Sequence, residues 1–176
     1  ANDCVAMGSA LPWLTEGDIA DIADTGQRPF THKAGRYGLV VPTWGLGVAS
    51  IIHNGQTMQV IDSEGGHANF APPCEKLTAL LQYHLQHGRS LSFGDVISQS
   101  GLEMLYNYIA ASSDKPAADL RAQEILLYAR NDADPACLEA IRYFARALGA
   151  WAGDVALMLG AVDGGFLVSP FGNEVT

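Results

Sequence analysis

The first half of the chain contains short apolar runs separated by turn residues, a pattern typical of strands. Residues 38–41 and 48–52 are β-prone, and residues 58–61 follow an Asn54-Gly55 pair. Asn-Gly is typical of a type I′ turn, because both central residues of that turn take positive φ. We therefore predict three strands, with a β-hairpin over residues 48–61.

Helical spacing replaces this pattern after Pro72-Pro73. One predicted helix face repeats apolar positions at steps of three and four, and it consists of Leu77, Leu80, Leu81, His84 and Leu85. Further helices are expected at about residues 102–110, 117–130 and 135–159. The last has the clearest apolar seam, which consists of Cys137, Ile141, Phe144, Leu148, Trp151, Val155 and Met158.

The remaining segments complete the predicted fold. Residues 3–14 are expected to form a short helix that a proline stops, and residues 25–35 an exposed connection. Gly149 and Gly153 lie on one side of the longest helix, where we expect another backbone to approach closely. Residues 164–168 are predicted to be a glycine turn entering a buried strand. The expected fold class is α/β (α+β), a mixed sheet with a β-hairpin in the first half and a mainly helical second half.

Composition is that of one globular domain. Of the 176 residues, 48% are hydrophobic and 16% charged, which excludes a disordered or collagen-like chain. A domain of this size buries roughly two-thirds of the surface of its unfolded chain, so we expect residues 1–176 to form a single domain. The net charge of −9 disfavours nucleic acid and membrane surfaces as partners, because both attract basic residues.

Two further features concern the environment of the protein. The longest apolar segment, residues 147–162, is interrupted by Asp154 and is shorter than the roughly 20 residues of a membrane-spanning helix. No export signal is visible at the start of the sequence. Cys4, Cys74 and Cys137 lie far apart, which favours neither a disulfide framework nor a zinc ribbon. We expect reduced cysteines in a cytoplasmic protein.

Two glycine clusters are candidates for chemistry. Gly45-Leu46-Gly47 lies between predicted strands, where a glycine turn can present backbone N–H groups to a phosphate; the alternative is a plain β-turn. Glu64-Gly65-Gly66-His67 places a carboxylate beside an imidazole, and together these groups can accept and donate hydrogen bonds to adjacent sugar hydroxyls. The alternatives there are a structural turn, or a metal site with His84 and His87.

The other motifs are less specific. By themselves, Asn2-Asp3 are typical of a helix cap, and residues 98–100 are typical of a helix start. No nucleophile elbow, Walker A loop or dinucleotide fingerprint occurs in the sequence.

The order of these elements is more specific than any one of them. The ordered set resembles the bacterial glucokinase family, and it consists of Asn2-Asp3, residues 45–49, residues 64–67, Phe70-Ala71-Pro72, residues 96–102, residues 157–160 and Gly164-Gly165. That family belongs to the actin-like ATPase superfamily of sugar kinases, whose two α/β domains close over sugar and ATP. The resemblance implies that the chain is the larger domain of a longer protein, without the family's small N-terminal domain and C-terminal segment.

The resemblance also implies roles for individual residues on the sugar side. Asp3 matches the catalytic base that accepts the proton of the glucose 6-hydroxyl, and Asn2 matches its sugar-binding neighbour. Glu64 and His67 match ligands of the sugar hydroxyls. The implied substrate is glucose or a related hexose.

On the nucleotide side, the implied cofactors are ATP and Mg²⁺, with no metal ligand assigned to this chain. The glycines that match nucleotide-binding positions are Gly45, Gly47, Gly164 and Gly165. The implied partner is the missing small domain. Independently of the resemblance, the apolar seam of residues 137–158 can pack either internally or against a second copy in a homodimer.

Several positions depart from the family pattern. Trp44 replaces a threonine of the second phosphate loop, where its bulk would obstruct a phosphate. Gly94 replaces a sugar-binding glutamate, with Asp95 next to it as a candidate substitute. Residues 169–171 replace an Ala-Gly-Gly on the adenosine side, and the first phosphate loop is absent.

These departures leave three functions to compare. The first is an ATP-dependent hexose kinase of glycolysis that is not active as this isolated chain. The second is a non-catalytic sugar-binding or regulatory pseudokinase, and the third is a structural oligomerisation module.

Overall fold

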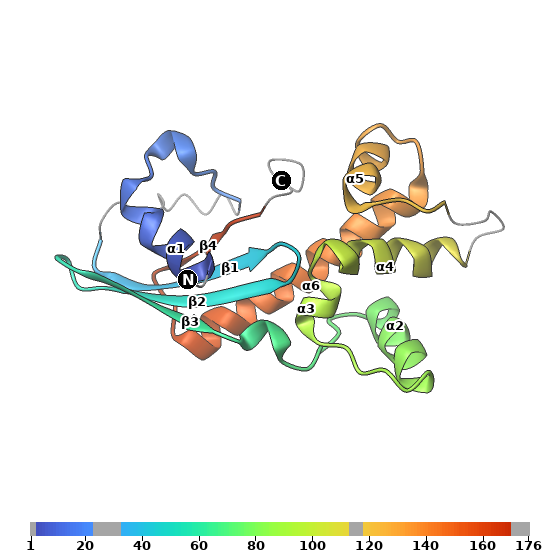
Figure 1. Ribbon diagram of the computed structural model, residues 1–176, viewed down its shortest axis with the longest axis horizontal. Helices are drawn as coiled ribbons and strands as arrows, with labels where there is room; N and C mark the ends of the chain where they lie inside the picture. Colours follow the sequence, from blue (N-terminus) through green and yellow to red (C-terminus); the bar gives the residue numbers. More distant parts are fainter. Residues whose placement is uncertain (1–2, 23–32, 113–117, 170–176) are drawn as a thin grey trace.

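The computed structural model, which describes residues 3–22, 33–112 and 118–169, contains a four-stranded mixed sheet in the order β3-β2-β1-β4 (Figure 1). The strands are β1 (Gly35–Pro42), β2 (Leu46–His53), β3 (Met58–Ser63) and β4 (Gly164–Leu167). β1, β2 and β3 pair antiparallel in sequence order, while β4 runs parallel to β1. The predicted α/β fold class is confirmed. Most of the connection predicted over residues 25–35 lies outside the described residues.

Helices bury both faces of this sheet, because successive residues of a strand point to opposite sides. On one face, Leu39 and Ile51 form a core with α1 (Asp3–Ala10). On the other face, Val40 and Val48 belong to the larger core with α6 (Pro135–Leu159) and the helices that precede it. The ends of β1 and β2 are therefore held between two packed layers.

The hairpin predicted over residues 48–61 forms from β2 and β3, but its turn lies one residue later than predicted. The Asn54 N–H donates to the Thr57 carbonyl over 3.1 Å, which makes Gly55 and Gln56 the central residues. Of these two, only Gly55 takes positive φ, at 95°. The type I′ assignment of Asn54-Gly55 is therefore wrong.

Three of the four remaining helices in the described residues were predicted, although the one expected from about residue 117 begins at residue 122; the short helix over residues 93–96 was not predicted. The four helices are α2 (Glu75–Gln86), α3 (Phe93–Val96), α4 (Gln99–Ala110) and α5 (Ala122–Arg130), with 3₁₀ turns at Leu11–Trp13, Glu16–Asp18 and Gly65–His67. The proline expected to stop the first helix lies in the 3₁₀ turn directly after α1. On the predicted face of α2, Leu77, Leu80 and His84 are buried, whereas Leu85 is 54% exposed, so its assignment is wrong.

The apolar seam of α6 is buried over most of its length. Cys137, Phe144 and Trp151 are at most 2% exposed, but Met158 in the last turn is 63% exposed, contrary to the prediction. A stripe with alternating steps of three and four drifts by about 20° per heptad around a straight helix. Over the three heptads from Cys137 to Met158, this drift carries the stripe off the buried face.

Two predictions about the last third of the chain also need correction. β4 was predicted to be a buried strand, but it pairs with β1 at the edge of the sheet, and its residues are exposed or half-buried. Gly149 and Gly153 were expected to meet another backbone, but a Cβ built on either would have no described atom within 4 Å. Within the described ranges, none of the helices is both long and apolar enough to span a bilayer.

The open space at Gly149 leads to a first testable expectation. Glycine in an exposed helix interior costs about 0.5–1 kcal/mol relative to alanine, so Gly149→Ala and Gly153→Ala are each expected to raise the free energy of unfolding by up to that amount. Urea denaturation measures the change. Gly101→Ala is the contrasting variant, since its Cβ would overlap the Val96 carbonyl oxygen, and a loss of stability in Gly149→Ala would reveal a backbone contact on this side of α6.

Candidate functional site

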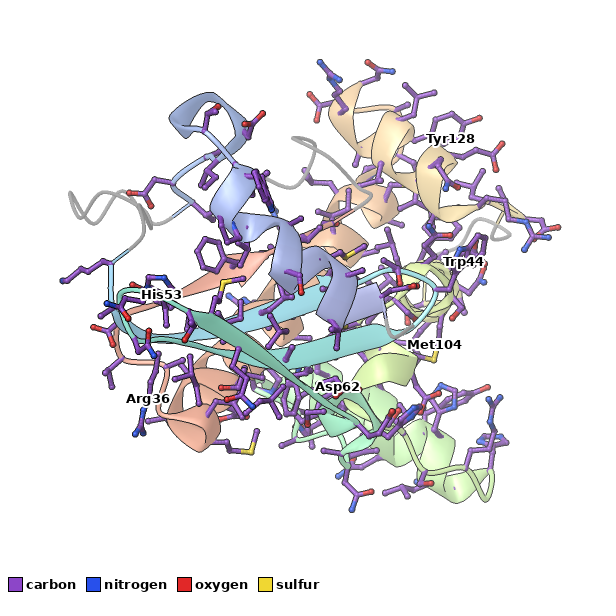
Figure 2. The ribbon with its side chains drawn as sticks, turned by 60° about the vertical axis from the view of Figure 1, so that its left-hand side comes forward. Arg36, Trp44, His53, Asp62, Met104 and Tyr128 are labelled. Atoms are coloured by element: carbon purple, nitrogen blue, oxygen red, sulfur yellow. The ribbon has the colours of Figure 1, made fainter. Side chains whose placement is uncertain are left out.

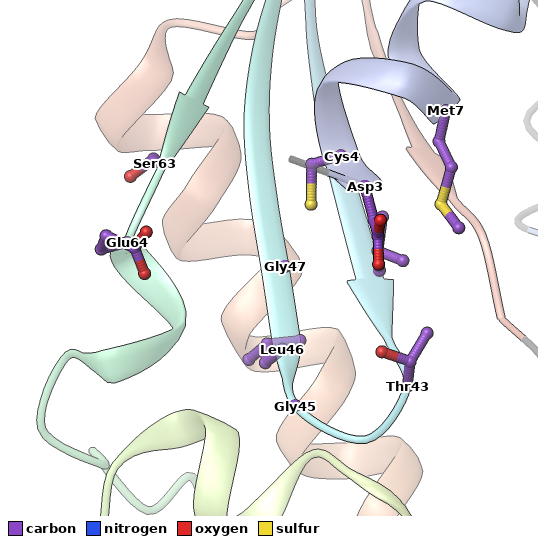
Figure 3. A pocket seen from close by; sticks show the side chains of 10 residues that line it. Asp3, Cys4, Met7, Thr43, Gly45, Leu46, Gly47, Ser63 and Glu64 are labelled. Atoms are coloured by element: carbon purple, nitrogen blue, oxygen red, sulfur yellow. The ribbon is translucent and has the colours of Figure 1, made fainter. Parts of the chain in front are cut away.

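An open pocket of about 400 Å³ lies where β1 ends and β2 begins, next to the first turn of α1 (Figure 3). Asp3 and Thr43 line it on the β1 side, and Ser63 and Glu64 line it at the end of β3. Gly45 and Gly47 form part of the wall between them. The pocket therefore gathers two carboxylates, two hydroxyls and a glycine turn from three separate segments.

Asp3 reaches this pocket because α1 is seated closely on the sheet. The Sγ of Cys4 occupies the position where a side chain of Gly47 would begin. One turn later, a Cβ on Gly8 would lie only 2.7 Å from Cγ1 of Val60. Gly47 thus allows the first turn of α1 to approach β2, and Gly8 allows the next turn to approach β3.

The β1–β2 turn is fixed by backbone hydrogen bonds. The Thr43 N–H donates to the Gly45 carbonyl over 2.8 Å, and the Gln99 N–H at the start of α4 donates to the Thr43 carbonyl over 3.0 Å. Trp44, at the tip of this turn, is 84% exposed and does not line the pocket (Figure 2). The obstruction expected from its indole is therefore absent from the pocket.

The Glu64–His67 segment is held against β2 by close backbone contacts. A Cβ on Gly66 would overlap the Leu46 carbonyl oxygen, and a Cβ on Gly94 would lie 3.2 Å from the Gly66 carbonyl oxygen. Glu64 Oε2 lies 3.6 Å from His67 Nε2, and both side chains are more than 80% exposed. Glu64 lines the pocket, whereas His67 lies beside it as the partner of Glu64.

Asp95, the candidate substitute for a sugar-binding glutamate, already holds another role. Its Oδ2 accepts the N–H and the hydroxyl of Ser92 at 2.7 and 2.6 Å, which caps α3. Burial by itself would raise the pKa of this carboxyl, but the Ser92 hydrogen bonds lower it below its ordinary value, helped by Arg89 and His67. The carboxylate is thus committed to α3.

The predicted nucleotide-side glycines at the end of the chain lie elsewhere. Gly164 and Gly165 pair with Tyr37 and Gly38, toward the start of β1, while the pocket is at the end of β1. Asn2 lies outside the described residues. Of the predicted site residues, the structure brings Asp3, Gly45, Gly47 and Glu64 together.

Acidic groups lie near Cys4, which also lines the pocket. Burial raises the pKa of the Cys4 thiol, and the negative charges of Asp3, Asp62 and Glu64 raise it further. Thr43 and Ser63, which line the pocket, and Asp62, whose charge acts on Cys4, were not among the predicted site residues. Thr43 directly follows β1, and Asp62 and Ser63 are the last two residues of β3, so polar residues at strand ends are the sequence signal for this site.

The metal alternative for the histidines finds no support in the described part of the chain. Within it, no group of three or more His, Cys, Asp or Glu residues is arranged to hold a metal ion. His84 is buried on α2, and this burial lowers its pKa, together with the charges of Arg89 and His87. A second open pocket of about 500 Å³, between α2 and α6, contains none of the predicted site residues.

Comparisons of sequence and of fold point to one protein family. The family model Glucokinase matches residues 1–169. A bifunctional protein glk from Burkholderia lata is 36% identical over 167 residues, which cover 94% of this chain and 25% of that protein.

Two solved structures resemble the fold. A glucokinase from an Antarctic psychrotroph has a TM-score of 0.74 at 27% identity, covering 97% of this chain and 53% of that one. A ROK family glucokinase from Streptomyces griseus, in complex with glucose and AMPPNP, has a TM-score of 0.58 at 18% identity and covers 85% of this chain and 47% of that one. The chain thus spans a quarter to about half of the length of these proteins. Since the family model covers nearly all of the sequence, the chain belongs to the glucokinase family.

Proposed function

We propose that the protein containing this chain is a hexose kinase, which transfers the γ-phosphoryl group of ATP to the 6-hydroxyl of glucose or a related hexose. The observation that carries the proposal is the convergence of Asp3 and Glu64, from separate segments, on one pocket walled by a glycine turn. The Streptomyces griseus relative, whose structure holds glucose and an ATP analogue, supports the ligand classes. The chain would be the larger domain, and the rest of the protein would complete the nucleotide side.

In this mechanism, each residue of the chain has a limited task. Asp3 accepts the proton of the 6-hydroxyl group of the sugar. At the same time the 6-oxygen bonds to the γ-phosphorus of ATP, and the bond between the γ-phosphorus and the oxygen that leaves with ADP breaks. Glu64 and His67 bind other sugar hydroxyls, with Asn2 as a further ligand. Most of the rate enhancement in such a transfer comes from positioning.

The phosphates of ATP fit the β1–β2 turn. A Cβ on Gly45 would meet nothing within 4 Å, and the Thr43 hydroxyl group is part of the same wall. Backbone N–H groups in such a turn can hold phosphate oxygens. Mg²⁺ would arrive with ATP and neutralise charge on the phosphates. Gly164 and Gly165 are retained as nucleotide-binding residues only by family resemblance.

A cytoplasmic location is part of the proposal. Cys4, Cys74 and Cys137 are free thiols, as expected for a protein of a reducing compartment.

A second function, sugar binding without catalysis, is favoured by a specific observation. Gly94 offers no side chain to a sugar, and the carboxylate of Asp95 is held by Ser92. The site would then have fewer sugar ligands than the family pattern. Such a pseudokinase would bind hexose and not MgATP.

The full-length gene product distinguishes these functions in one assay series. A kinase releases ADP with glucose and MgATP but not with 6-deoxyglucose, which lacks the accepting hydroxyl. Thermal unfolding with each ligand alone adds a binding readout, because a ligand that prefers the folded state raises its stability. Stabilisation by glucose alone, without ADP release, indicates the pseudokinase, and no stabilisation by either ligand rejects both functions.

A further inference from the structure

The two glycines of the β1–β2 turn face different surroundings. A Cβ on Gly45 would meet nothing within 4 Å, so this position is open. A Cβ on Gly47 would overlap the Sγ of Cys4, and its next neighbours are the Cβ and carbonyl oxygen of Val41 at 3.4 and 3.6 Å. The side-chain direction of residue 47 therefore points to the first turn of α1.

Cys4 directly follows Asp3 in the first turn of α1, and its side chain is anchored in the core. Its side chain is 6% exposed and belongs to the core between α1 and the sheet. Gly8 makes a second close approach to Val60 one turn later, and positions i and i+4 share one helix face. Of these two contacts, the one made by Cys4 is next to Asp3 in the sequence.

We propose that Gly47 is a positioning residue for Asp3. Its missing side chain seats the Cys4 thiol on β2, and this contact places the Asp3 carboxylate at the reacting hydroxyl. The inference rests on the proposed hexose kinase function. The positioning role differs from the phosphate-binding role that the family resemblance implies for Gly47. A phosphate would be bound by the backbone N–H of residue 47, and alanine has the same N–H.

A double-mutant cycle in the full-length protein tests this coupling. Since a displacement of about 1 Å can cost about 100-fold in rate, Gly47→Ala is expected to lower kcat by about that factor, with little change in the KM for MgATP. Cys4→Ala removes the atom that Ala at 47 would strike, and the nearest remaining neighbour lies at 3.4 Å. The overlap in Gly47→Ala is also expected to lower the Tm. The double variant Cys4→Ala/Gly47→Ala is therefore expected to recover most of the lost kcat and most of the lost Tm.

Two kinetic outcomes would overturn the proposal. One is a double variant no more active than Gly47→Ala. The other is a Gly47→Ala variant with a raised KM for MgATP at unchanged kcat, which would assign Gly47 to the phosphates.

Crystal structures of both variants provide a readout that needs no activity. The first turn of α1 is expected to shift in Gly47→Ala and to return in the double variant. If the wild-type protein phosphorylates no hexose, the proposed function fails. An α1 that stays in place in Gly47→Ala refutes the positioning role separately.

Discussion

The Asp3→Asn variant of the full-length protein is expected to phosphorylate glucose with a kcat about 1,000-fold below that of the wild type. A positioned general base contributes roughly 10²–10⁴-fold, and asparagine keeps the shape of aspartate without its capacity to take a proton. Because Asp3 is exposed at the start of α1, the substitution leaves the core intact. A coupled assay of ADP release measures the loss.

Asp154→Asn is the matched control for this experiment. Asp154 is an exposed carboxylate on α6 and does not line the pocket, so its replacement should leave kcat at the wild-type value. Equal activity of Asp3→Asn and wild type would remove Asp3 as the base. Glucose binding by Asp3→Asn, measured by calorimetry, separates a lost proton acceptor from a lost binding site.

The second large effect is expected for Gly66→Ala. A Cβ at this position would overlap the carbonyl oxygen of Leu46 and lie 3.1 Å from its Cβ. Leu46 is the first residue of β2 and pairs with Pro42 of β1, so a shift of its carbonyl would disturb this pairing. Overpacking of this kind costs about 1–3 kcal/mol, and the Glu64–His67 segment must move away from β2. We expect a lower free energy of unfolding in urea and a weaker affinity for glucose.

Gly65→Ala provides the neighbouring control for Gly66→Ala. Its Cβ would lie 3.3 Å from the Ser63 hydroxyl oxygen and 3.6 Å from Trp151. A hydroxyl can rotate where a strand carbonyl cannot, so Gly65→Ala should lose less stability. If both variants were equally stable, the contact with Leu46 would not be what holds the segment.

The elements of the fold were predictable because burial decides them. Alternating and helical apolar patterns located β1 to β3, α2 and α4 to α6, since each has one face toward a core, whereas the four residues of α3 are too few to show such a pattern. The turn after β2 was mispredicted because a side chain decides it. The Asn54 side-chain oxygen accepts the N–H groups of Gln56 and Thr57 at 2.9 and 2.8 Å, so Asn54 takes the first position of the turn and Gly55 and Gln56 take the central ones.

The site was predictable only in part, and the glycines show why. In the sequence, Gly45 and Gly47 form one motif. Their spacing does not reveal that Gly45 faces open space whereas Gly47 contacts α1. Gly149 and Gly153 likewise suggested a close approach that the described structure does not contain. A glycine can be required by a close contact or can stand where a side chain would also fit. Which of the two holds depends on the surface opposite the glycine, and residues distant in the sequence form that surface.

The parallel pairing of β4 with β1 also affects how the protein is made. The pocket is built from residues 3–64, all near one hairpin, whereas the Arg36 N–H donates to Asp163 Oδ2 across 127 positions of sequence. Domains fold while the ribosome is still extending them, so one edge of β1 waits unpaired until the whole helical half has been synthesised. An unpaired edge is a template for pairing with other chains, so during this interval the growing chain is exposed to aggregation through β1.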